Sequence, residues 1–252
     1  MSGRVVFIGA GPGAADLITL RGARLLGTAE VVLYDALTDP ALRDFAPHAR
    51  WVHVGKRGFS DSTGQATINA LLVKHANEVD VVVRLKGGDP SIFGRLEEEL
   101  DALADSGIEC EIVPGVTAAI AAAAATKRPL TRRGNGRSVS FTTAMTRTGA
   151  LHASRTADTE VFYMAGKQLC ALSRRLIEAG WPSDTPVCVV SRAGWPDQLH
   201  SEHNVATMPR ASLLHAGRPT IVTVGAGAQA LRPTTSRNSV DTPATFVETL
   251  KP

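Results

Sequence analysis

The chain has 252 residues, of which 44% are hydrophobic, and its 27 basic side chains nearly balance its 24 acidic ones. This composition excludes an intrinsically disordered protein, which would combine low hydrophobicity with high net charge. The three cysteines, Cys110, Cys170 and Cys188, are too few and too widely spaced for a disulfide scaffold, and they predict reduced thiols in a cytoplasmic protein. A chain of this length allows two compact domains that share a cleft.

Neither a leader nor a membrane segment is expected. Residues 1–9 hold one basic side chain and a short apolar run that passes directly into a glycine-rich turn, unlike a secretory signal peptide. The alanine-rich stretch 118–125 is far shorter than the ~20 apolar residues that a membrane-spanning helix needs. We therefore expect a protein that is not embedded in a membrane.

Short apolar runs alternate with longer amphipathic segments in the first half of the chain, as they do in strands joined by crossover helices. The pattern predicts an α/β lobe over residues 1–133, in which helices cover a mostly parallel sheet. Strands are expected at 5–8, 30–34, 51–54, 79–85 and 110–113, and helices at 17–26, 66–76 and 92–103.

A second, smaller α/β lobe is predicted over residues 134–231. It follows a stretch rich in basic residues and chain breakers, 126–136, which is typical of a crossing loop. Trp181 and Trp195 are expected to pack this lobe, and residues 232–252 to form a mobile tail. The expected strands lie at 138–143, 160–164, 187–191 and 220–224, with a helix at 168–179.

A glycine-rich turn, Gly9-Ala10-Gly11-Pro12-Gly13-Ala14, follows the first expected strand and matches the G-x-G-x-x-A fingerprint of dinucleotide sites. Asp35 stands where such a site has its ribose-binding acid. However, Pro12 has no backbone N–H to donate to a phosphate, so a ligand without phosphates fits better. A nicotinamide dinucleotide site and a tight turn that binds nothing stay open as alternatives.

Two further turns follow expected strands, at residues 86–90 and 114–118. Ligands of open α/β sheets bind in the crevice at the carboxyl ends of the strands, so these turns are expected to line one site. Asp89 could bind a positively charged amino group or cap the helix that follows Pro90. Thr117 could likewise cap the alanine-rich helix or donate a hydrogen bond to a ligand.

Several motifs, taken together, resemble those of the tetrapyrrole methylases, in the same order and over about residues 4–225. The pair formed by residues 54–57 and 84–90 is far more specific than a single glycine turn. The motifs are Gly9-Ala10-Gly11-Pro12-Gly13, Leu33-Tyr34-Asp35, Val54-Gly55-Lys56-Arg57, Arg84-Leu85-Lys86-Gly87-Gly88-Asp89-Pro90 with Ile92-Phe93-Gly94-Arg95, Val113-Pro114-Gly115-Val116-Thr117-Ala118, Pro129-Leu130-Thr131 and Phe162-Tyr163-Met164.

This resemblance implies a homodimer of two-lobed α/β chains, with S-adenosylmethionine bound in the cleft between the lobes. The sparse cysteines, with no Cys-x-x-Cys, indicate no metal site. The cofactor has an amino-acid end, an adenosine and a sulfonium but no phosphate, so bare main chain and one carboxylate are suitable partners. The cofactor contacts that the family implies are Pro12, Gly87, Gly88, Asp89, Ile92, Thr117, Ala118, Met164 and Ala193.

The same resemblance implies Asp35 and Lys56 as acid-base residues and Arg95 as a further member of the catalytic centre. It also implies that Arg95, Glu98 and Met164 contact the tetrapyrrole. The chemistry fits, because a pyrrole carbon must be held in line with the sulfonium methyl and a proton must then be lost. Without the family, Asp35 is an ordinary strand-end acid and Lys56 a surface lysine.

Within the family, the motifs are most similar to those of enzymes that methylate C2 and C7 of uroporphyrinogen III, which gives precorrin-2 for sirohaem or cobalamin. Residues 127–137 carry five basic side chains and no acid. Beside the cleft, such a loop would attract and orient the eight carboxylates of this substrate, and a solvated loop between the lobes is an equal alternative. Nucleic acid is disfavoured because only 5% of the residues are aromatic.

A few positions depart from the family pattern, and they leave the methyl acceptor open. Another precorrin methyltransferase, a diverged paralogue and a module that binds cofactor without turnover are the alternatives, with an NAD-dependent oxidoreductase more distant. His200 and His203 lack the third ligand of a metal site. The departures are Leu96 and Glu97 in place of two glycines, Arg132 in place of a histidine, Ala144 and Met145 in place of a Gly-His pair, and Ala193 in place of a glycine near the cofactor.

Overall fold

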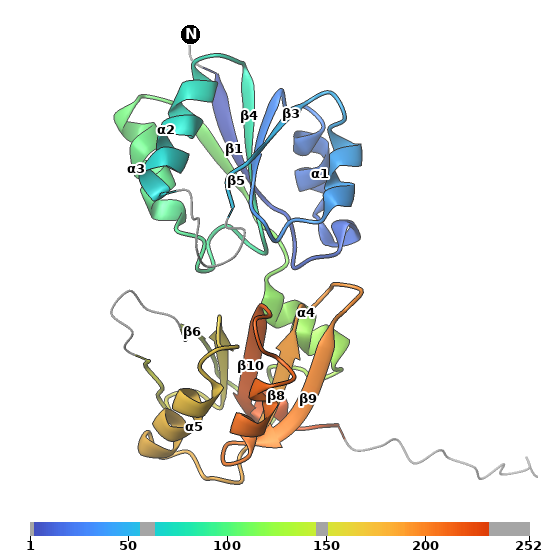
Figure 1. Cartoon of the computed structure of the whole chain (residues 1–252), viewed down its shortest axis with the longest axis vertical. Helices are drawn as coiled ribbons and strands as arrows, with labels where there is room; N and C mark the ends of the chain where they lie inside the picture. Colours follow the sequence, from blue (N-terminus) through green and yellow to red (C-terminus); the bar gives the residue numbers. More distant parts are fainter. Residues whose placement is uncertain (1–2, 56–63, 145–150, 232–252) are drawn as a thin grey trace, which may run out of the picture.

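The computed structural model describes residues 3–55, 64–144 and 151–231, which form two lobes stacked along the long axis of the molecule (Figure 1). Each lobe is built around one five-stranded sheet, so the predicted two-lobed α/β fold is confirmed. In chain order, with η for a 3₁₀ helix, the elements are β1 (Arg4–Gly9), η1 (Ala15–Leu17), α1 (Leu20–Leu26), β2 (Val31–Tyr34), η2 (Pro40–Phe45), β3 (Arg50–His53), α2 (Gln65–Ala76), β4 (Val81–Lys86), α3 (Leu96–Asp105), β5 (Cys110–Val113), α4 (Ala118–Ala125), β6 (Val139–Thr143), β7 (Thr159–Tyr163), α5 (Leu169–Glu178), β8 (Pro186–Ser191), β9 (Leu199–Asn204), η3 (Met208–Ser212), β10 (Thr220–Gly225) and η4 (Ala226–Ala228).

The first lobe has a parallel sheet with the strand order β3-β2-β4-β1-β5. Successive residues of a strand point to opposite faces, so its side chains divide between two cores. Val5, Phe7 and Val82 pack under α2 and α3, whereas Val6 and Val83 pack with α1 on the other face (Figure 1). Because both faces are buried, the strands appear in the sequence as short, nearly unbroken apolar runs.

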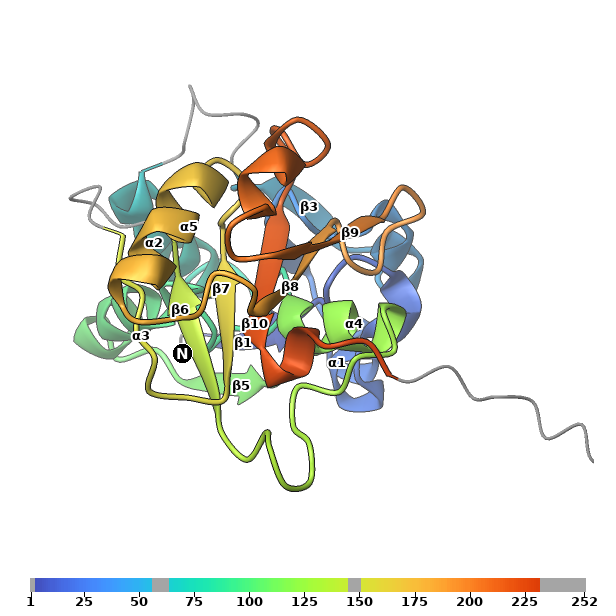
Figure 2. The ribbon, with the colours of Figure 1, turned by 90° about the horizontal axis from the view of Figure 1, so that it is seen from below.

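The second lobe has a mixed sheet with the order β6-β7-β10-β8-β9, in which β6 and β7 run parallel and the other neighbours antiparallel. On one face, Phe162 and Val189 share a core with Leu172 of α5. On the other face, Val190 packs with Ala119 of α4. Viewed from below, the two helices lie on opposite sides of the central strands (Figure 2).

Strand β9 is absent from the sequence prediction. It lies at the edge of the second sheet, and its sequence, Leu199-His200-Ser201-Glu202-His203-Asn204, is mostly polar. An edge strand that is only partly covered needs few apolar side chains. The apolar run on which a strand prediction depends is therefore missing.

The chain crosses between the lobes just before α4 (Figure 1). The predicted first lobe extends to residue 133 and includes this helix, whereas in the structure Ala119 and Ala122 pack against Val161 and Val190 of the second sheet. The small alanine side chains let the helix lie close to that sheet, so α4 belongs to the core of the second lobe. The exact limits of the two domains stay a prediction.

Two predicted helices begin later than the sequence pattern indicates, α1 at Leu20 and α3 at Leu96. In α3 the cause is the backbone of Phe93 and Arg95, whose φ angles of 53° lie in the left-handed region. A right-handed helix does not continue through such residues. Residues 90–95 consequently form a turn at the edge of the first lobe.

Side chains from each lobe reach the other. The Trp195 ring packs against Arg192 of the second lobe, with a centroid distance of 4.2 Å, and its indole N–H donates to the Pro12 carbonyl at 3.1 Å. This tryptophan therefore bridges the lobes, beyond the packing of the second lobe that was predicted. Trp181 is buried in the second core, as predicted. Ile92 of the first lobe packs against the core that contains α4.

The predicted tail, 232–252, lies outside the described residues. Within the described ranges, no helix is both long enough and apolar enough to cross a membrane. The same ranges contain no group of three His, Cys, Asp or Glu side chains placed to hold a metal ion. His203 Nε2 instead lies 2.8 Å from Ser201 Oγ, within β9.

Candidate active site

Three loops of the first lobe meet at the carboxyl edge of its sheet, which faces the second lobe (Figure 1). They are the turns that follow β1, β4 and β5. Gly88 N–H donates to the Gly11 carbonyl at 2.7 Å, and Gly11 N–H donates to the Gly88 carbonyl at 3.2 Å. Gly115 N–H donates to Asp89 Oδ2 at 2.9 Å. The three turns expected to line one site are therefore joined to one another.

The glycines of these turns leave little space for side chains. A Cβ on Gly115 would lie 2.7 Å from Gly9 Cα, and a Cβ on Gly9 would lie 2.6 Å from Gly115 N. Gly88 has a φ of +71°, a conformation that favours glycine. The edge is thus walled by bare main chain, which a ligand can approach closely.

Asp89 uses both carboxylate oxygens to hold these turns. Its Oδ1 accepts the Ser91 N–H at 2.8 Å, and its Oδ2 accepts the Gly115 N–H. Because α3 begins only at Leu96, Asp89 does not cap that helix, and this alternative is wrong. Its contact with a cofactor stays a prediction.

Thr117 precedes α4 but does not cap it through its side chain. Its Oγ1 instead lies 2.8 Å from the Tyr163 hydroxyl, a hydrogen bond that ties the crossing segment to the end of β7. Burial raises the pKa of Tyr163, against the opposing effect of this hydrogen bond, so the phenol is neutral near pH 7. Phe93 and Phe141 pack on the same ring with centroid separations of 4.9 and 5.7 Å. An aromatic cluster therefore lies where the lobes face each other, next to Met164.

Unusual backbone conformations gather at the facing edges. Non-glycine residues rarely adopt positive φ, yet Phe93, Arg95, Met164 and Arg192 have φ angles between 50° and 57°. Such residues cluster at functional sites, because the surrounding structure must hold them in place. Arg95 and Met164 are among the predicted site residues, and their conformation adds support to that prediction.

The first glycine turn is unsuited to a pyrophosphate. Gly11 N–H is already bonded to Gly88, and Pro12 has no N–H. The Trp195 indole covers Gly13, where a Cβ would lie 2.7 Å from Cε2. The turn leads into the three-residue η1 instead of a long helix whose N-terminus binds phosphate.

The strand order also differs from a dinucleotide-binding sheet. In the Rossmann order 3-2-1-4-5-6 the first two strands are neighbours, whereas here β4 lies between β1 and β2. The G-x-G-x-x-A fingerprint therefore occurs here without the Rossmann strand order and without the long helix that binds a pyrophosphate at its N-terminus. Fold and turn together contradict the oxidoreductase alternative.

Asp35 follows β2 at the same edge, and its carboxylate belongs to a buried ion cluster of Asp35, Arg84, Lys86 and Glu99. Asp35 Oδ1 accepts from Arg84 Nη2 at 2.6 Å, and Glu99 Oε1 accepts from Arg84 Nε at 2.8 Å. Glu99 Oε2 accepts from Lys86 Nζ. Arg84 and Lys86 are 3% exposed and Glu99 is fully buried. Two cations and two carboxylates balance, as buried charges require.

Burial affects the two cations of the ion cluster differently. For Lys86, burial and the neighbouring charge of Arg84 lower the pKa, although Glu99 and Asp35 oppose this effect. For Arg84, burial acts in the same direction, but the charges of Asp35 and Glu99 outweigh it and raise the pKa. Arg84 is therefore the permanent cation of the ion cluster, and Lys86 is the one more easily neutralised.

Arg95 and Glu98 form a bidentate ion pair beside the ion cluster. Arg95 Nε and Nη2 each donate to one Glu98 oxygen at 2.7 Å. This hydrogen bonding raises the pKa of Arg95 and lowers the pKa of Glu98. Both side chains are exposed and therefore accessible to a ligand. Lys56, the other predicted acid-base residue, lies outside the described residues.

We compared the sequence with models of known protein families. The family model of Tetrapyrrole (Corrin/Porphyrin) Methylases matches residues 4–209. The chain belongs to the tetrapyrrole methylase family. The resemblance seen in the sequence motifs is thereby confirmed.

The chain is similar to known methyltransferases over nearly its whole length. The uroporphyrinogen-III C-methyltransferase of Pseudomonas aeruginosa is 41% identical over 230 residues, which are 89% of this chain and 94% of that protein. The uroporphyrin-III C-methyl transferase of Thermus thermophilus, solved in complex with S-adenyl homocysteine, has a TM-score of 0.77 at 34% identity and covers 88% of this chain and 97% of its own. A cobalt precorrin-4 methyltransferase structure has a TM-score of 0.79 at 30% identity, with coverages of 90% and 96%. The expected class of enzyme, an S-adenosylmethionine-dependent methyltransferase of tetrapyrrole biosynthesis, is confirmed.

The basic stretch 127–137 does not lie beside the cleft of the methylase. Arg132 donates to the carbonyl of Gln229, just beyond the end of β10. Because β7 and β10 are antiparallel, this end lies beside the start of β7 and away from Tyr163 at its other end. Arg128 is itself buried. The prediction that this loop orients the substrate is wrong, since Arg132 is bonded at the end of the second lobe that lies away from Tyr163.

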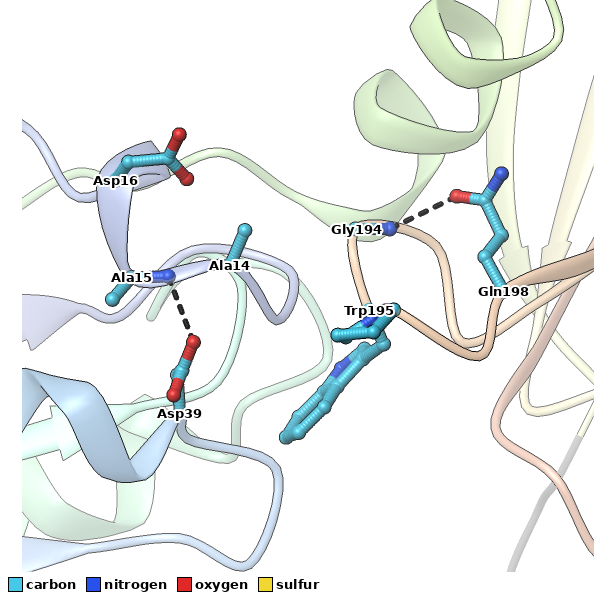
Figure 3. A pocket seen from close by; sticks show the side chains of 8 residues that line it. Ala14, Ala15, Asp16, Asp39, Gly194, Trp195 and Gln198 are labelled. Carbon is cyan, nitrogen blue, oxygen red and sulfur yellow. Dashed lines mark hydrogen bonds between the residues drawn. The ribbon is translucent and has the colours of Figure 1, made fainter.

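A cavity of about 810 Å³ opens between the lobes beside Trp195 (Figure 3). Asp39 Oδ2 accepts the Ala15 N–H at 3.1 Å on one side, and Gln198 Oε1 accepts the Gly194 N–H at 3.0 Å on the other. None of the predicted cofactor contacts lines it, so it is a neighbour of the predicted site, bounded by the loop that carries Ala193. Its lining consists of Ala14, Ala15, Asp16, Asp39, Gly194, Trp195, Pro196 and Gln198.

The buried ion pairs that hold Asp35 were not predicted from the sequence, although the sequence contains a pattern that indicates them. Arg84 and Lys86 stand two residues apart in an otherwise apolar strand, so they share one face of the sheet. Glu99 stands four residues before buried Leu103, on the apolar side of α3. Charged residues at core positions of two packed elements indicate a buried ion cluster.

Some departures from the family pattern have structural consequences. Leu96, at the start of α3, packs against the first core. Ala144 is buried in the second core, and its N–H donates to the Tyr163 carbonyl at 2.9 Å. Ala193 is buried in the core that contains α4. Met145 lies outside the described residues.

Proposed function

We propose that this methylase transfers two methyl groups from S-adenosylmethionine to C2 and C7 of uroporphyrinogen III, giving precorrin-2 for sirohaem or cobalamin synthesis. The observation that carries the proposal is the joined set of glycine turns, which offers bare main chain but no free row of N–H donors for a phosphate. Such a surface suits the amino-acid end and the adenosine of a phosphate-free cofactor. The likeness to the Pseudomonas aeruginosa protein favours uroporphyrinogen III as the acceptor.

The bound cofactor supplies an electrophilic methyl group. The electron pair of a pyrrole carbon forms the new C–C bond, the pair of the broken C–S bond stays on sulfur, and the macrocycle then loses a proton. The chain has two tasks, to hold carbon and methyl in line at ~3–3.5 Å and to accept the proton. We assign the second task to Asp35 and Lys56.

The geometry of Asp35 supports this assignment. Arg84 fixes one carboxylate oxygen, and the other has no hydrogen-bond partner among the residues that the structure describes. The Asp35 side chain is 29% exposed at the edge that faces the second lobe. A carboxylate held at one oxygen and open at the other is well placed to accept a proton.

The site of the tetrapyrrole is proposed between the start of α3, at Arg95 and Glu98, and Met164, which follows β7 of the second lobe. Glu98 holds the guanidinium of Arg95 as a fork, and a substrate carboxylate can take the place of Glu98 in the same bidentate geometry. Arg95 thereby acts as the member of the catalytic centre that orients the macrocycle. The proposed cofactor contacts are Pro12, Gly87, Gly88, Asp89, Ile92, Thr117, Ala118, Met164 and Ala193.

Another precorrin is the second candidate for the methyl acceptor. Leu96 replaces a family glycine, and its packing in the first core fixes the start of α3 beside the turn 90–95. A substrate of different shape from uroporphyrinogen III would explain this less adaptable turn. The likeness to a cobalt precorrin-4 methyltransferase points in the same direction.

We also propose that the enzyme works in the cytoplasm as a homodimer, as the family resemblance and the three unpaired cysteines support. Light scattering after size-exclusion chromatography tests the assembly. A mass near twice the 26.5 kDa of one chain supports the dimer, and a mass of one chain contradicts it.

An anaerobic assay with uroporphyrinogen III and methyl-labelled S-adenosylmethionine tests the function. Two labelled methyl groups in the product support the proposal. Methylation of a later precorrin but not of uroporphyrinogen III selects the second candidate. Calorimetry with S-adenosylhomocysteine and with NAD tests the site itself, and binding of NAD alone would overturn it. Cofactor binding without methylation of any tetrapyrrole would indicate the non-catalytic module.

A further inference from the structure

The ion cluster replaces apolar packing where β4 ends, at the edge of the first sheet that faces the second lobe. Val82, Arg84 and Lys86 alternate along the strand and therefore share its face. Val82 packs with the apolar residues of α2 and α3, whereas the next two positions on that face carry charge and meet Glu99 of α3. Well-packed apolar residues would stabilise such a place at least as well as buried ion pairs. A role in stability alone does not account for the charges.

Arg84 is almost completely bonded. Its Nε donates to Glu99, its Nη2 to Asp35, and its Nη1 to the carbonyls of Leu33 at 3.4 Å and Leu85 at 3.2 Å. Bonds to two neighbouring strands and to α3 fix the plane of the guanidinium. Arg84 therefore holds Asp35 Oδ1 in one position.

Lys86 has a flexible stem and a single carboxylate partner in the described structure, Glu99. The charge of Asp35 also acts on Lys86, because it is among the influences that raise the lysine pKa. The charge of Lys86 also lowers the pKa of Glu98, but both oxygens of Glu98 are bonded to Arg95. If Glu99 lost its charge, Asp35 would therefore be the carboxylate left with an open oxygen. A buried ammonium needs a partner, so Lys86 would turn toward the open oxygen of Asp35.

We propose that Glu99 is a positioning residue, which holds Lys86 away from Asp35 and so keeps one oxygen of the Asp35 carboxylate free for the proton of the tetrapyrrole. This inference rests on the proposed function, in which Asp35 accepts that proton. Glu99 is buried and touches no substrate. It acts through Lys86.

The glycine turns are held independently of the ion cluster. Gly88 is bonded to Gly11, and Gly115 is bonded to Asp89, without any contribution from Glu99. Loss of the Glu99 charge should therefore lower the rate of methyl transfer and leave the affinity for the cofactor product almost unchanged. A structural defect would lower both.

The test uses the full-length chain and a double-mutant cycle. We expect Glu99→Gln to lower kcat with uroporphyrinogen III at least tenfold, while the Kd of S-adenosylhomocysteine changes less than twofold. The Lys86→Met variant has no ammonium group that could turn toward Asp35. Adding Glu99→Gln to this variant should therefore change its kcat less than twofold. Glu97→Gln, the same substitution at an exposed position of α3, is the matched control and should leave kcat unchanged.

Several outcomes would overturn the inference. They are a Glu99→Gln variant with normal kcat, a loss of cofactor affinity that parallels the loss of rate, and a tenfold effect of Glu99→Gln that persists without Lys86. If Glu99→Gln alone does not fold, the comparison of Lys86→Met with the double variant decides the question.

A crystal structure of Glu99→Gln separates this inference from the proposed function. Lys86 Nζ within about 3.2 Å of the open oxygen of Asp35 supports the positioning role, whatever the substrate proves to be. Lys86 left near position 99 contradicts it. A wild-type chain that does not methylate uroporphyrinogen III overturns the proposed function alone.

Discussion

Each lobe buries a cluster of polar side chains, and the two clusters differ in charge. In the first lobe the ion cluster joins Asp35 to Glu99 through Arg84. In the second lobe the imidazole of His215 bridges two serines, with Nδ1 bonded to Ser191 Oγ and Nε2 lying 2.9 Å from Ser201 Oγ. Burial, with the nearby charges of the other histidines and Arg218, lowers the pKa of His215 to about 4, so this cluster is neutral near pH 7.

The difference shows how a buried polar cluster reveals its role. The two nitrogens of His215 are both bonded to side chains of the same lobe, so nothing is left for a ligand. The ion cluster instead ends in the Asp35 carboxylate, whose side chain is 29% exposed at the edge of the sheet that faces the second lobe. A satisfied neutral cluster holds strands together, whereas charge that leads from a core to a cleft indicates chemistry. Burial by itself does not distinguish them.

The largest effect is expected at the open end of the ion cluster. Asp35→Asn keeps an oxygen for the bond from Arg84 but removes the proton acceptor, so kcat should fall about 100-fold or more. The Kd of S-adenosylhomocysteine should change less than twofold in calorimetry. Asp105→Asn, at the exposed end of α3, is the control. A normal kcat for Asp35→Asn would show that Asp35 is not the proton acceptor and that the ion cluster has no role in catalysis.

The next largest effect is expected where bare main chain surrounds the cofactor site. In Gly115→Ala the new Cβ would meet Gly9 and the Gly88 carbonyl, so the three turns must separate. We expect the affinity for S-adenosylhomocysteine to fall on the order of 100-fold, because the displaced main chain would lose hydrogen bonds to the ligand that contribute about 1–3 kcal/mol. Gly64→Ala, whose Cβ would have its nearest neighbour at 3.9 Å, should bind normally. Normal binding by Gly115→Ala would place the cofactor elsewhere.

The neutral cluster should affect stability and not turnover. His215→Gln leaves at least one buried serine without its partner, so the free energy of unfolding should fall by about 1–3 kcal/mol in urea titrations. The kcat should stay within twofold of wild type at a temperature where both proteins are folded. His48→Gln, at an exposed position, controls for the substitution. A large loss of kcat without a loss of stability would show that the neutral cluster of the second lobe also acts in catalysis.

A smaller effect is expected from pH alone. The pKa of His215 is about 4 in the folded protein against an ordinary value of 6.5, so the unfolded chain binds more protons between these pH values. The stability that depends on the neutral imidazole is complete above pH 6.5 and is lost as pH falls toward 4. Calorimetry should show the melting temperature falling by on the order of 5 °C across this range. The decline should be shallower in His215→Gln, and an equal decline would dismiss His215 as its cause.

The sequence predicted the first lobe better than the second. Strands such as β1 and β4 are buried on both faces, so Val5 to Ile8 and Val81 to Val83 stand out as apolar runs. β9 is a polar edge strand and gives no such signal. The alanines of α4 predict a helix, but they do not indicate which of the two sheets the helix covers, because small side chains can pack against either sheet.

For the site, the strand-end glycines and the family motifs were readable from local sequence alone. The partners of those residues were not. Asp35 and Arg84 are 49 positions apart, and Thr117 and Tyr163 are 46 apart, so their contacts depend on the order of strands and on the packing of the lobes. The basic stretch was misplaced for the same reason, since charge density does not show at which end of a sheet a loop lies.

The order of amino acids by itself determined where the main chain turns, which turns lack side chains, and the family to which the chain belongs. These properties are local, because a glycine or a proline sets the conformation of its own few residues. Only the tertiary structure decided that β4 lies between β1 and β2, which joins Gly88 to Gly11 and Arg84 to Asp35. Contacts between distant segments form when whole elements pack, and no short stretch of sequence contains that information.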